Sequence, residues 1–267
     1  MIRVFQCEDT LTGIMTGVYD AWDSRLGHGQ VRLQTAQNMD LELFCEYVTV
    51  FPDLVKAEKV LRTIQRRMGE EAFEMIAYAS SYPDDRKADA LYRMIVLGLH
   101  LPDGREICGM LTQPEVRLVF ELRRKAWHIA HRYMGFVRFR ELKSGVLLSV
   151  IDAEADVLAL IAPHFADRLP LENWTIYDRR RKKAAVHPAG KGWLILEEVE
   201  EACFCSQKES EEEARYDALW KIFHQAVGIA ERTNPDLQSS FLPRKFRPFM
   251  NEFSGRQEAS KGGRDLL

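Results

Sequence analysis

Residues 115–151 read EVRLVFELRRKAWHIAHRYMGFVRFRELKSGVLLSVI, and this stretch decides the fold class because its apolar period changes along the chain. Up to residue 134, apolar residues recur at the spacing of one buried helix face. They are Val119, Leu122, Ala126, Ile129 and Tyr133. Residues 136–142 and 146–151 instead have the pattern of two strands around a Lys-Ser-Gly turn. We therefore expect a helix that ends at a left-handed Gly135 and is followed by a hairpin.

The sequence before this stretch is mostly helical in character. A short strand at residues 2–6 precedes helices that capping residues and the 3.6-residue apolar period predict. We expect them over residues 10–23, 53–68, 69–78 and 84–100. A Pro-Asp-Gly turn within residues 101–113 favours a hinge there.

The sequence after the hairpin predicts one further helix, three short strands and a last long helix. The helix covers residues 156–168, and the strands cover residues 174–177, 184–187 and 193–196. The patterns Ser206-x-x-Glu209 and Ser210-x-x-Glu213 are capping boxes that predict the start of the last helix. Its apolar stripe, which we expect in the core, is Tyr216, Leu219, Phe223 and Val227.

These elements predict an α+β fold, with a helical N-terminal half and a C-terminal half in which long helices flank a small antiparallel sheet. We divide the chain into three regions by composition and motifs. They are a mainly helical region over residues 1–112, a basic α+β region over residues 113–253 and a disordered tail over residues 254–267.

The overall composition is that of an ordinary soluble globular protein. Of the 267 residues, 46% are hydrophobic and 29% are charged, and 37 lysines and arginines against 40 acidic residues give a net charge of −3. This balance excludes a protein that is basic all over. The N-terminus has no signal-peptide pattern and no apolar run is long enough to span a bilayer, so we expect a cytoplasmic protein without a membrane partner. Five cysteines without a repeated spacing indicate reduced thiols.

The near-neutral total hides strongly segregated charge. Residues 117–143 carry eight basic and two acidic residues, and residues 178–191 carry six basic and one acidic. Residues 197–213 carry eight glutamates against one lysine. The segregation favours a nucleic-acid-facing side and an acidic side free to meet a protein partner.

The first basic segment combines cations with aromatic residues. Arg117, Arg124, His128 and His131 share one side of the expected helix. Arg138 and Arg140 share a strand face, roughly 6 to 7 Å apart. With Tyr133, Phe136 and Phe139 interleaved, the segment suits phosphates and stacked bases. The alternative is a solvated amphipathic helix leading into a strand.

Two further segments each have two interpretations. The five cations of residues 179–183 form the tip of an expected hairpin, which either meets a polyanion or pairs with the acidic residues 197–213. Near the C-terminus, Arg232, Arg244 and Lys245 are candidate phosphate contacts. The alternative there is a strap that packs its phenylalanines, Phe241, Phe246 and Phe249, on the core.

Motifs for catalysis or metal binding are weak. The sequence contains no Walker loop, Gly-x-Gly-x-x-Gly or Gly-x-Ser-x-Gly pattern. His128 and His131 could share an ion, but two ligands are not a site, so we expect no metal and no cofactor. The weak catalytic candidates are His131, His164 and Asp178, whose side chains could exchange protons or orient water.

Several stretches in a fixed order resemble a known family. They are GFVRFREL at 135–142, LIAPHFADR at 160–168, NWTIYDR at 173–179, LWK at 219–221, ERTNP at 231–235 and LPRKF at 242–246. With them, roughly residues 4–253 resemble a bacterial family of proteins assigned to DNA metabolism or repair. The N-terminus departs from the family pattern, because Phe5, Gln6 and Cys7 stand where members often have tyrosine, aspartate and glycine.

The resemblance implies a setting and a partner. The family carries a domain of unknown function that is also joined to uracil-DNA glycosylases, and its members are encoded beside a radical S-adenosylmethionine (SAM) protein associated with DNA modification or repair. We therefore expect a DNA-binding accessory subunit of that radical SAM enzyme. The alternatives are a stand-alone glycosylase-like or nuclease-like enzyme and a protein-binding scaffold. The expected DNA contacts are Arg124, His128, Arg132, Arg138, Arg140, Lys143, Arg179, Arg180, Arg181, Lys182, Lys183, Arg232, Arg244 and Lys245.

Overall fold

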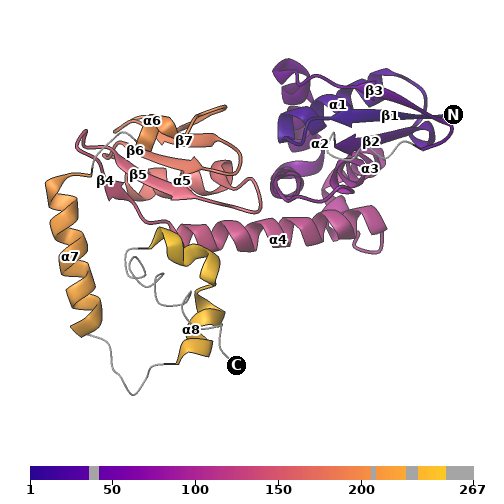
Figure 1. The fold of residues 1–267 in the computed structure, drawn as a ribbon. Helices are drawn as coiled ribbons and strands as arrows, with labels where there is room; N and C mark the ends of the chain where they lie inside the picture. The colour runs from indigo at the N-terminus through magenta and orange to yellow at the C-terminus, as the bar shows by residue number, and fades with distance from the viewer. Residues whose placement is uncertain (36–41, 206–208, 227–233, 251–267) are drawn as a thin grey trace, which may run out of the picture. The chain divides into compact units, whose positions relative to one another are not determined.

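The computed structural model describes residues 1–35, 42–205, 209–226 and 234–250 (Figure 1). The chain divides into two compact units, which we describe separately. Unit 1 consists of Met1–Ala130 and Glu154–Val157, and unit 2 of His131–Ala153 and Leu158–Leu267. The chain passes from unit 1 to unit 2 within helix α4 (Pro114–Phe136), between Ala130 and His131. The expected boundary between residues 112 and 113 was drawn from composition and motifs, which a division by contacts does not test, so it stays a prediction. The expected tail, residues 254–267, lies outside the described residues.

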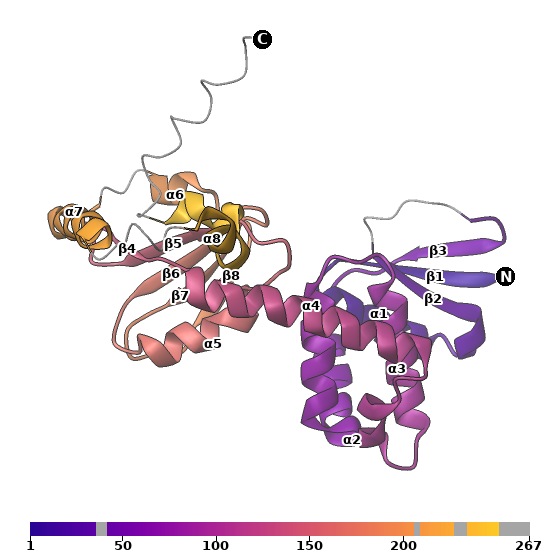
Figure 2. The same cartoon turned by 90° about the horizontal axis from the view of Figure 1, so that it is seen from below.

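Unit 1 contains a three-stranded parallel sheet. Its strands are β1 (Ile2–Cys7), β2 (Val31–Thr35) and β3 (Cys45–Thr49), in the order β2-β1-β3 (Figure 2). Helix α1 (Leu11–Asp23) connects β1 to β2, as a parallel pair requires. Only β1 is predicted by the apolar pattern, since β2 and β3 mix polar and apolar residues.

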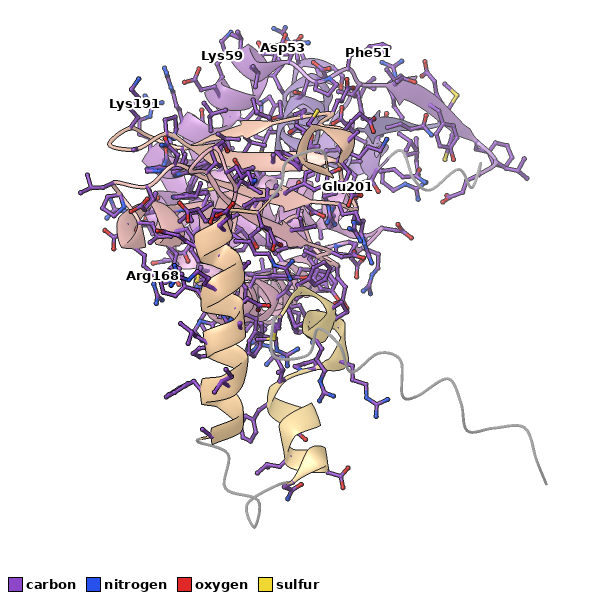
Figure 3. The ribbon with its side chains drawn as sticks, turned by 60° about the vertical axis from the view of Figure 1, so that its left-hand side comes forward. Phe51, Asp53, Lys59, Arg168, Lys191 and Glu201 are labelled. Carbon is purple, nitrogen blue, oxygen red and sulfur yellow. The ribbon has the colours of Figure 1, made fainter. Side chains whose placement is uncertain are left out.

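Helices form the rest of unit 1. They are α2 (Leu54–Ser81), α3 (Lys87–His100), the first part of α4, and the 3-10 helices η1 (His28–Gln30) and η2 (Gly104–Gly109). Asp53, labelled in Figure 3, caps α2 by accepting hydrogen bonds from the Val55 and Lys56 N–H groups. Gly69 has φ of 86° and kinks α2 where the sequence predicts a new helix to begin. Residues 101–113, the predicted hinge, contain η2, which packs on α2.

Helix α1 approaches β1 closely at Gly17. A Cβ atom on Gly17 would clash with the Sγ atom of Cys7, which is fully buried in the core of unit 1. Burial raises the pKa of the Cys7 thiol to about 12 and that of the Cys108 thiol to about 11. Both thiols therefore stay protonated and inert near neutral pH.

Unit 2 contains a five-stranded mixed sheet. Its strands, in spatial order, are β4 (Arg140–Glu141), β5 (Leu147–Ile151), β6 (Trp174–Asp178), β7 (Lys183–His187) and β8 (Leu194–Leu196). Helix α5 (Leu158–Arg168) makes the crossover between β5 and β6, which are parallel, and the other pairs are antiparallel. The α+β fold class is confirmed, and the hairpin turn is too, with Gly145 at φ of 75°. The sheet expected to be antiparallel is mixed, because α5 crosses over between β5 and β6. The strand expected over residues 136–142 is shorter, since α4 extends to Phe136 and only Arg140 and Glu141 pair with β5.

The register gives this sheet two different faces. Trp174 and Ile176 lie on the face covered by α5, where Phe165 contacts Trp174 at a ring distance of 6.4 Å. Leu148 pairs with Thr175 and Val150 with Tyr177, and these four share the opposite face. Helix α6 (Ala202–Cys205) lies on that opposite face, where Phe204 meets Tyr177 at 5.2 Å (Figure 2).

The C-terminal elements of unit 2 are α7 (Glu211–Ala226), α8 (Pro235–Phe241) and η4 (Arg244–Phe249). The Ser210 cap is confirmed, because Ser210 Oγ accepts a hydrogen bond of 3.0 Å from Glu213 N. The reciprocal half of the capping box is not formed, since the Ser210 N–H group donates to the Glu141 carbonyl and Glu213 Oε2 accepts from Glu141 N. Ser206 lies outside the described residues. The expected core position of the α7 stripe is wrong: Tyr216, Leu219 and Phe223 are 68%, 60% and 55% exposed. Val227 lies outside the described residues. No helix in the described ranges could cross a membrane.

The left-handed helix end expected at Gly135 is also wrong. Helix α4 continues to Phe136, and Gly135 is not among the described glycines with positive φ. The buried stripe of α4 is confirmed, since Val119, Leu122, Ala126, Ile129 and Tyr133 are all buried.

Replacement of Gly17 by alanine tests the close approach of α1 to β1. We expect Gly17→Ala to lower the free energy of unfolding by about 1–3 kcal/mol, because the buried sulfur must move, despite a gain of up to about 1 kcal/mol in helix propensity. Gly29→Ala is the matched control, because a Cβ there meets nothing within 4 Å. Equal melting temperatures for Gly17→Ala and wild type would contradict the packing described.

The buried thiols give a pH-dependent prediction. The unfolded chain releases the Cys7 proton near its ordinary pKa of 9.0, whereas the folded chain holds it to about 12, so stability falls as pH rises through this range. Urea unfolding at pH 8 and pH 10 measures this loss. Native-state alkylation should label the exposed Cys203 rapidly and leave Cys7 and Cys108 unmodified. Equal labelling rates at all three would contradict the burial.

Candidate nucleic-acid interface

The basic turn between β6 and β7 lies against the acidic segment that follows β8. Arg179 Nη2 lies 2.6 Å from Glu201 Oε1, and Lys182 Nζ lies 3.0 Å from Glu200 Oε1. The Val199 N–H group donates a hydrogen bond of 2.7 Å to the Lys182 carbonyl, which fixes the two chain segments side by side. Glu201 is labelled in Figure 3. The structure thus has the tip paired with the acidic residues 197–213, which was the second of the two interpretations.

The other cations of the tip are also paired. Lys183 Nζ lies 3.2 Å from Glu197, and Arg180 Nε lies 2.9 Å from Asp152. Arg181 Nη1 lies 3.0 Å from the buried Asp178 carboxylate. The expectation of an acidic side free for a partner is therefore wrong for the paired glutamates, which are Glu197, Glu200, Glu201 and Glu209. Exposed pairs contribute only about 0–1 kcal/mol each, so they orient the tip more than they stabilise it.

The structure places the three weak catalytic candidates on different elements. Asp178 ends β6, where its Oδ1 accepts a hydrogen bond from Arg180 N and its Oδ2 pairs with Arg181. This carboxylate therefore holds the turn. His131 lies on α4 and His164 on α5. A catalytic role for these residues stays a prediction.

The aromatic residues expected to offer stacking surfaces are used in internal packing. Tyr133 and Phe136 contact Phe246 at ring distances of 5.0 and 4.9 Å, and Phe139 contacts Phe165 at 5.3 Å. Tyr133 is buried and offers no stacking surface, whereas Phe136 and Phe139 are half-buried, so a stacking role for these two stays a prediction. Phe246 is buried, which confirms the C-terminal strap at this position, whereas Phe241 is 75% exposed and does not pack as expected.

A pocket of about 330 Å³ lies on the face of the unit 2 sheet opposite α5. We call it the arginine pocket, because Arg138, Arg140 and Arg179 line it. It brings together the ends of β4 and β6 with α6 and the C-terminal strap. Its other lining residues are Leu142, Leu148, Val150, Phe204, Glu209, Pro248 and Phe249. Sequence reasoning predicted the arginines but not the phenylalanines, whose meeting depends on long-range packing.

The three arginines have different partners. Arg138 Nη1 donates hydrogen bonds to the Gly135 and Val137 carbonyls, and no carboxylate pairs with it in the described part of the chain. Arg140 pairs with Glu209 at 2.9 Å and Arg179 with Glu201, through side chains that are 41% and 52% exposed. The arginine pocket therefore has one carboxylate among its lining residues against three guanidinium groups, which favours an anion.

The remaining expected contacts lie at exposed positions. Arg124 and His128 are exposed on the part of α4 in unit 1. Arg132, Lys143, Arg244 and Lys245 are exposed on unit 2. Arg232 lies outside the described residues. Exposure is compatible with phosphate contact and with simple solvation, so these positions stay predictions.

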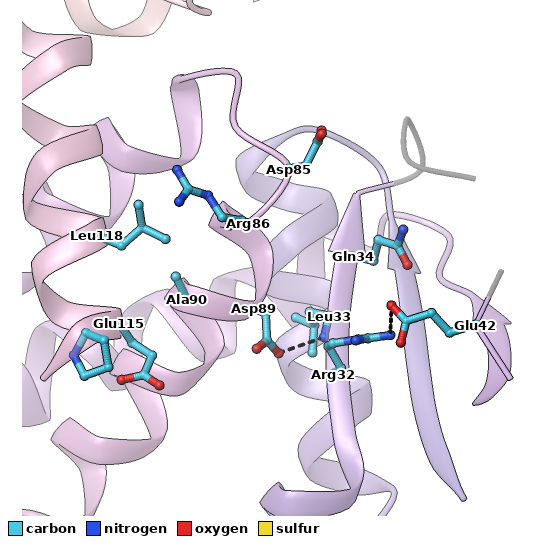
Figure 4. A pocket seen from close by; sticks show the side chains of 11 residues that line it. Arg32, Leu33, Gln34, Glu42, Asp85, Arg86, Asp89, Ala90, Glu115 and Leu118 are labelled. Atoms are coloured by element: carbon cyan, nitrogen blue, oxygen red, sulfur yellow. Dashed lines mark hydrogen bonds and ion pairs between the residues drawn. The ribbon is translucent and has the colours of Figure 1, made fainter. Parts of the chain in front are cut away.

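Unit 1 has a second cavity, of about 370 Å³, between β2 and the first turns of α3 and α4 (Figure 4). Its charged groups are largely engaged with one another. Arg32 pairs with Glu42 at 2.9 Å, and Asp89 Oδ1 accepts a hydrogen bond from Leu33 N. None of the expected site residues lines this cavity. The arginine pocket is therefore the better candidate.

Comparison with known proteins shows a family to which the chain is similar. A family model described as a domain of unknown function, DUF4130, matches residues 85–252. The match begins just before α3 and includes every residue of the arginine pocket. No curated protein matches the chain.

Replacement of Glu201 by glutamine tests whether this carboxylate competes with an added anion for Arg179. We expect Glu201→Gln to tighten binding of tripolyphosphate by about two- to fivefold, because Arg179 is freed from a competing carboxylate whose pair is worth about 0–1 kcal/mol. Isothermal titration measures the change. Glu58→Gln, which removes the exposed Arg62 pair in unit 1, is the control. Unchanged or weaker binding of tripolyphosphate by Glu201→Gln would contradict the assignment of an anion site to the arginine pocket.

Proposed function

The chain belongs to the DUF4130 family, and from that premise we propose that it is a DNA-binding protein of DNA metabolism or repair, acting as an accessory subunit. The proposal rests on one observation: arginines from β4, β6 and the α4–β4 link meet at one pocket lined also by aromatic rings. Phosphate contacts from such arginines supply sequence-independent affinity for nucleic acid.

The positions of the arginines support this assignment beyond their charge. Arg138 and Arg140 belong to the GFVRFREL stretch and Arg179 to the NWTIYDR stretch, which lie about forty residues apart in the sequence. Arg140 and Arg179 also pair with Glu209 and Glu201, but Arg138, which lines the same pocket, has no carboxylate partner among the described residues. In the accessory role, a partner performs the chemistry, and the family resemblance implies a radical SAM enzyme.

One observation favours the scaffold alternative. The stripe on α7, with Tyr216, Leu219, Trp220 and Phe223, is exposed over several turns, and exposed apolar stripes on amphipathic helices are common protein-contact surfaces. The two functions are compatible if α7 serves the partner and the arginine pocket serves DNA. If the chain binds no DNA at low salt, the DNA-binding functions are excluded and the protein-binding scaffold is the remaining alternative.

Removal of two pocket arginines tests DNA binding. We expect the double variant Arg138→Ala, Arg140→Ala to bind DNA more weakly and to lower the slope of log affinity against log salt by about two, because each arginine neutralises one phosphate. Fluorescence anisotropy with a labelled duplex and a labelled single strand, at several salt concentrations, measures both quantities.

Arg168→Ala is the matched control, because Arg168, labelled in Figure 3, is an exposed arginine at the end of α5 and not a pocket residue. It should leave the slope close to wild type. If the double variant and Arg168→Ala behave alike at every salt concentration, the proposed DNA contact is wrong. Product formation from damaged duplexes by the purified chain alone would instead support the stand-alone enzyme.

A further inference from the structure

We propose that the arginine pocket holds one unstacked nucleotide of a single strand, with its base between Phe204 and Phe249 and its phosphate on the arginines. This inference rests on the proposed function and adds the part of DNA that the site takes. The pocket volume of about 330 Å³ is at the lower end of small-ligand sites, which span about 300–1,000 Å³. Such a hollow suits a single base with its sugar and is too small for a base pair.

The walls of the pocket are suited to a base. Leu148 and Val150 form an apolar floor from adjacent outward positions of β5, and each is half-buried. Phe204 on α6 and Phe249 at the end of η4 come from different elements, and both are half-buried. Aromatic rings that keep part of their surface accessible inside a hollow can stack on any base, because every base has a π face.

The cations lie at the same pocket as the rings. Arg138 precedes β4 and Arg140 begins it, and both line the pocket. Arg179 arrives from the end of β6. A phosphate can replace Glu209 at Arg140 and Glu201 at Arg179, since both carboxylates are themselves 46% and 38% exposed and return to water when released.

A charge-only site and a nucleotide site make different predictions for the rings. Phe204 and Phe249 contribute no charge, so a phosphate site would not depend on them, whereas a base stacked on them would. Of the aromatic residues nearer the basic helix, Tyr133 is buried, and neither Phe136 nor Phe139 is among the lining residues of the pocket. The two half-buried rings are therefore the discriminating residues.

The experiment uses the full chain and leucine variants, which keep apolar packing and remove the flat ring. We expect Phe204→Leu, Phe249→Leu to bind a labelled oligothymidylate about tenfold more weakly, with the salt slope and the affinity for blunt duplex unchanged. Phe51→Leu, at an 80% exposed ring in unit 1 labelled in Figure 3, is the control. Circular dichroism and melting temperature verify that each variant is folded.

Competition separates the ligand sources. Against wild type, unlabelled oligothymidylate should displace the probe far better than inorganic polyphosphate of equal charge or thymidine monophosphate, and the leucine variant should lose the preference over polyphosphate. The inference would be overturned if polyphosphate or thymidine monophosphate competed as well as oligothymidylate. It would also be overturned if the leucine variant kept the wild-type affinity. The arginine variants test DNA binding itself, and the leucine variants test base stacking. If only the stacking inference is wrong, the arginine variants still weaken DNA binding; if the proposed function is wrong, they do not.

Discussion

The ion pairs between the β6–β7 turn and the acidic segment after β8 set the geometry on which the rest of unit 2 depends. Arg179, Lys182 and Lys183 each meet a glutamate of residues 197–201, and a backbone hydrogen bond links Val199 to Lys182. This pairing brings the chain back across the sheet just before α6 begins. Phe204 then reaches Tyr177 on the face opposite α5, and the arginine pocket forms beneath it.

The pairs direct the chain, and apolar burial stabilises it. Each exposed pair is worth about 0–1 kcal/mol, whereas each fully buried aliphatic or aromatic side chain contributes about 1.5–3 kcal/mol. Trp174, Ile176 and Tyr177 are all buried in β6, so the sheet persists when a surface pair opens. When the carboxylate partners of the arginines are exposed and bind weakly, phosphate can replace these carboxylates without loss of the fold. In our proposal, that difference in magnitude is what would allow one set of arginines both to organise the unliganded protein and to bind an anion.

Local patterns predicted the elements better than they predicted what covers them. The α4 stripe, the Ser210 cap and the Gly145 turn follow from spacing and backbone chemistry within a few residues, and the structure has all three. Strands β2 and β3 were missed because each is only five residues long and is stabilised by parallel pairing with the distant β1, which the sequence of either segment does not reveal. The α7 stripe has helical spacing but remains exposed, since periodicity identifies an apolar face without specifying its partner. For the site, charge runs located the arginines, and only long-range packing placed Phe204 and Phe249 beside them.

The central claim is that the face of the unit 2 sheet opposite α5 receives a nucleic-acid strand at the arginine pocket. Photo-crosslinking of the full chain to a single strand containing 5-bromodeoxyuridine, followed by peptide mapping, tests this directly. We predict crosslinks at Phe204 and Phe249 and in the peptide that carries Arg138 and Arg140. Crosslinks confined to α5 or to unit 1, with none in these three peptides, would contradict the account.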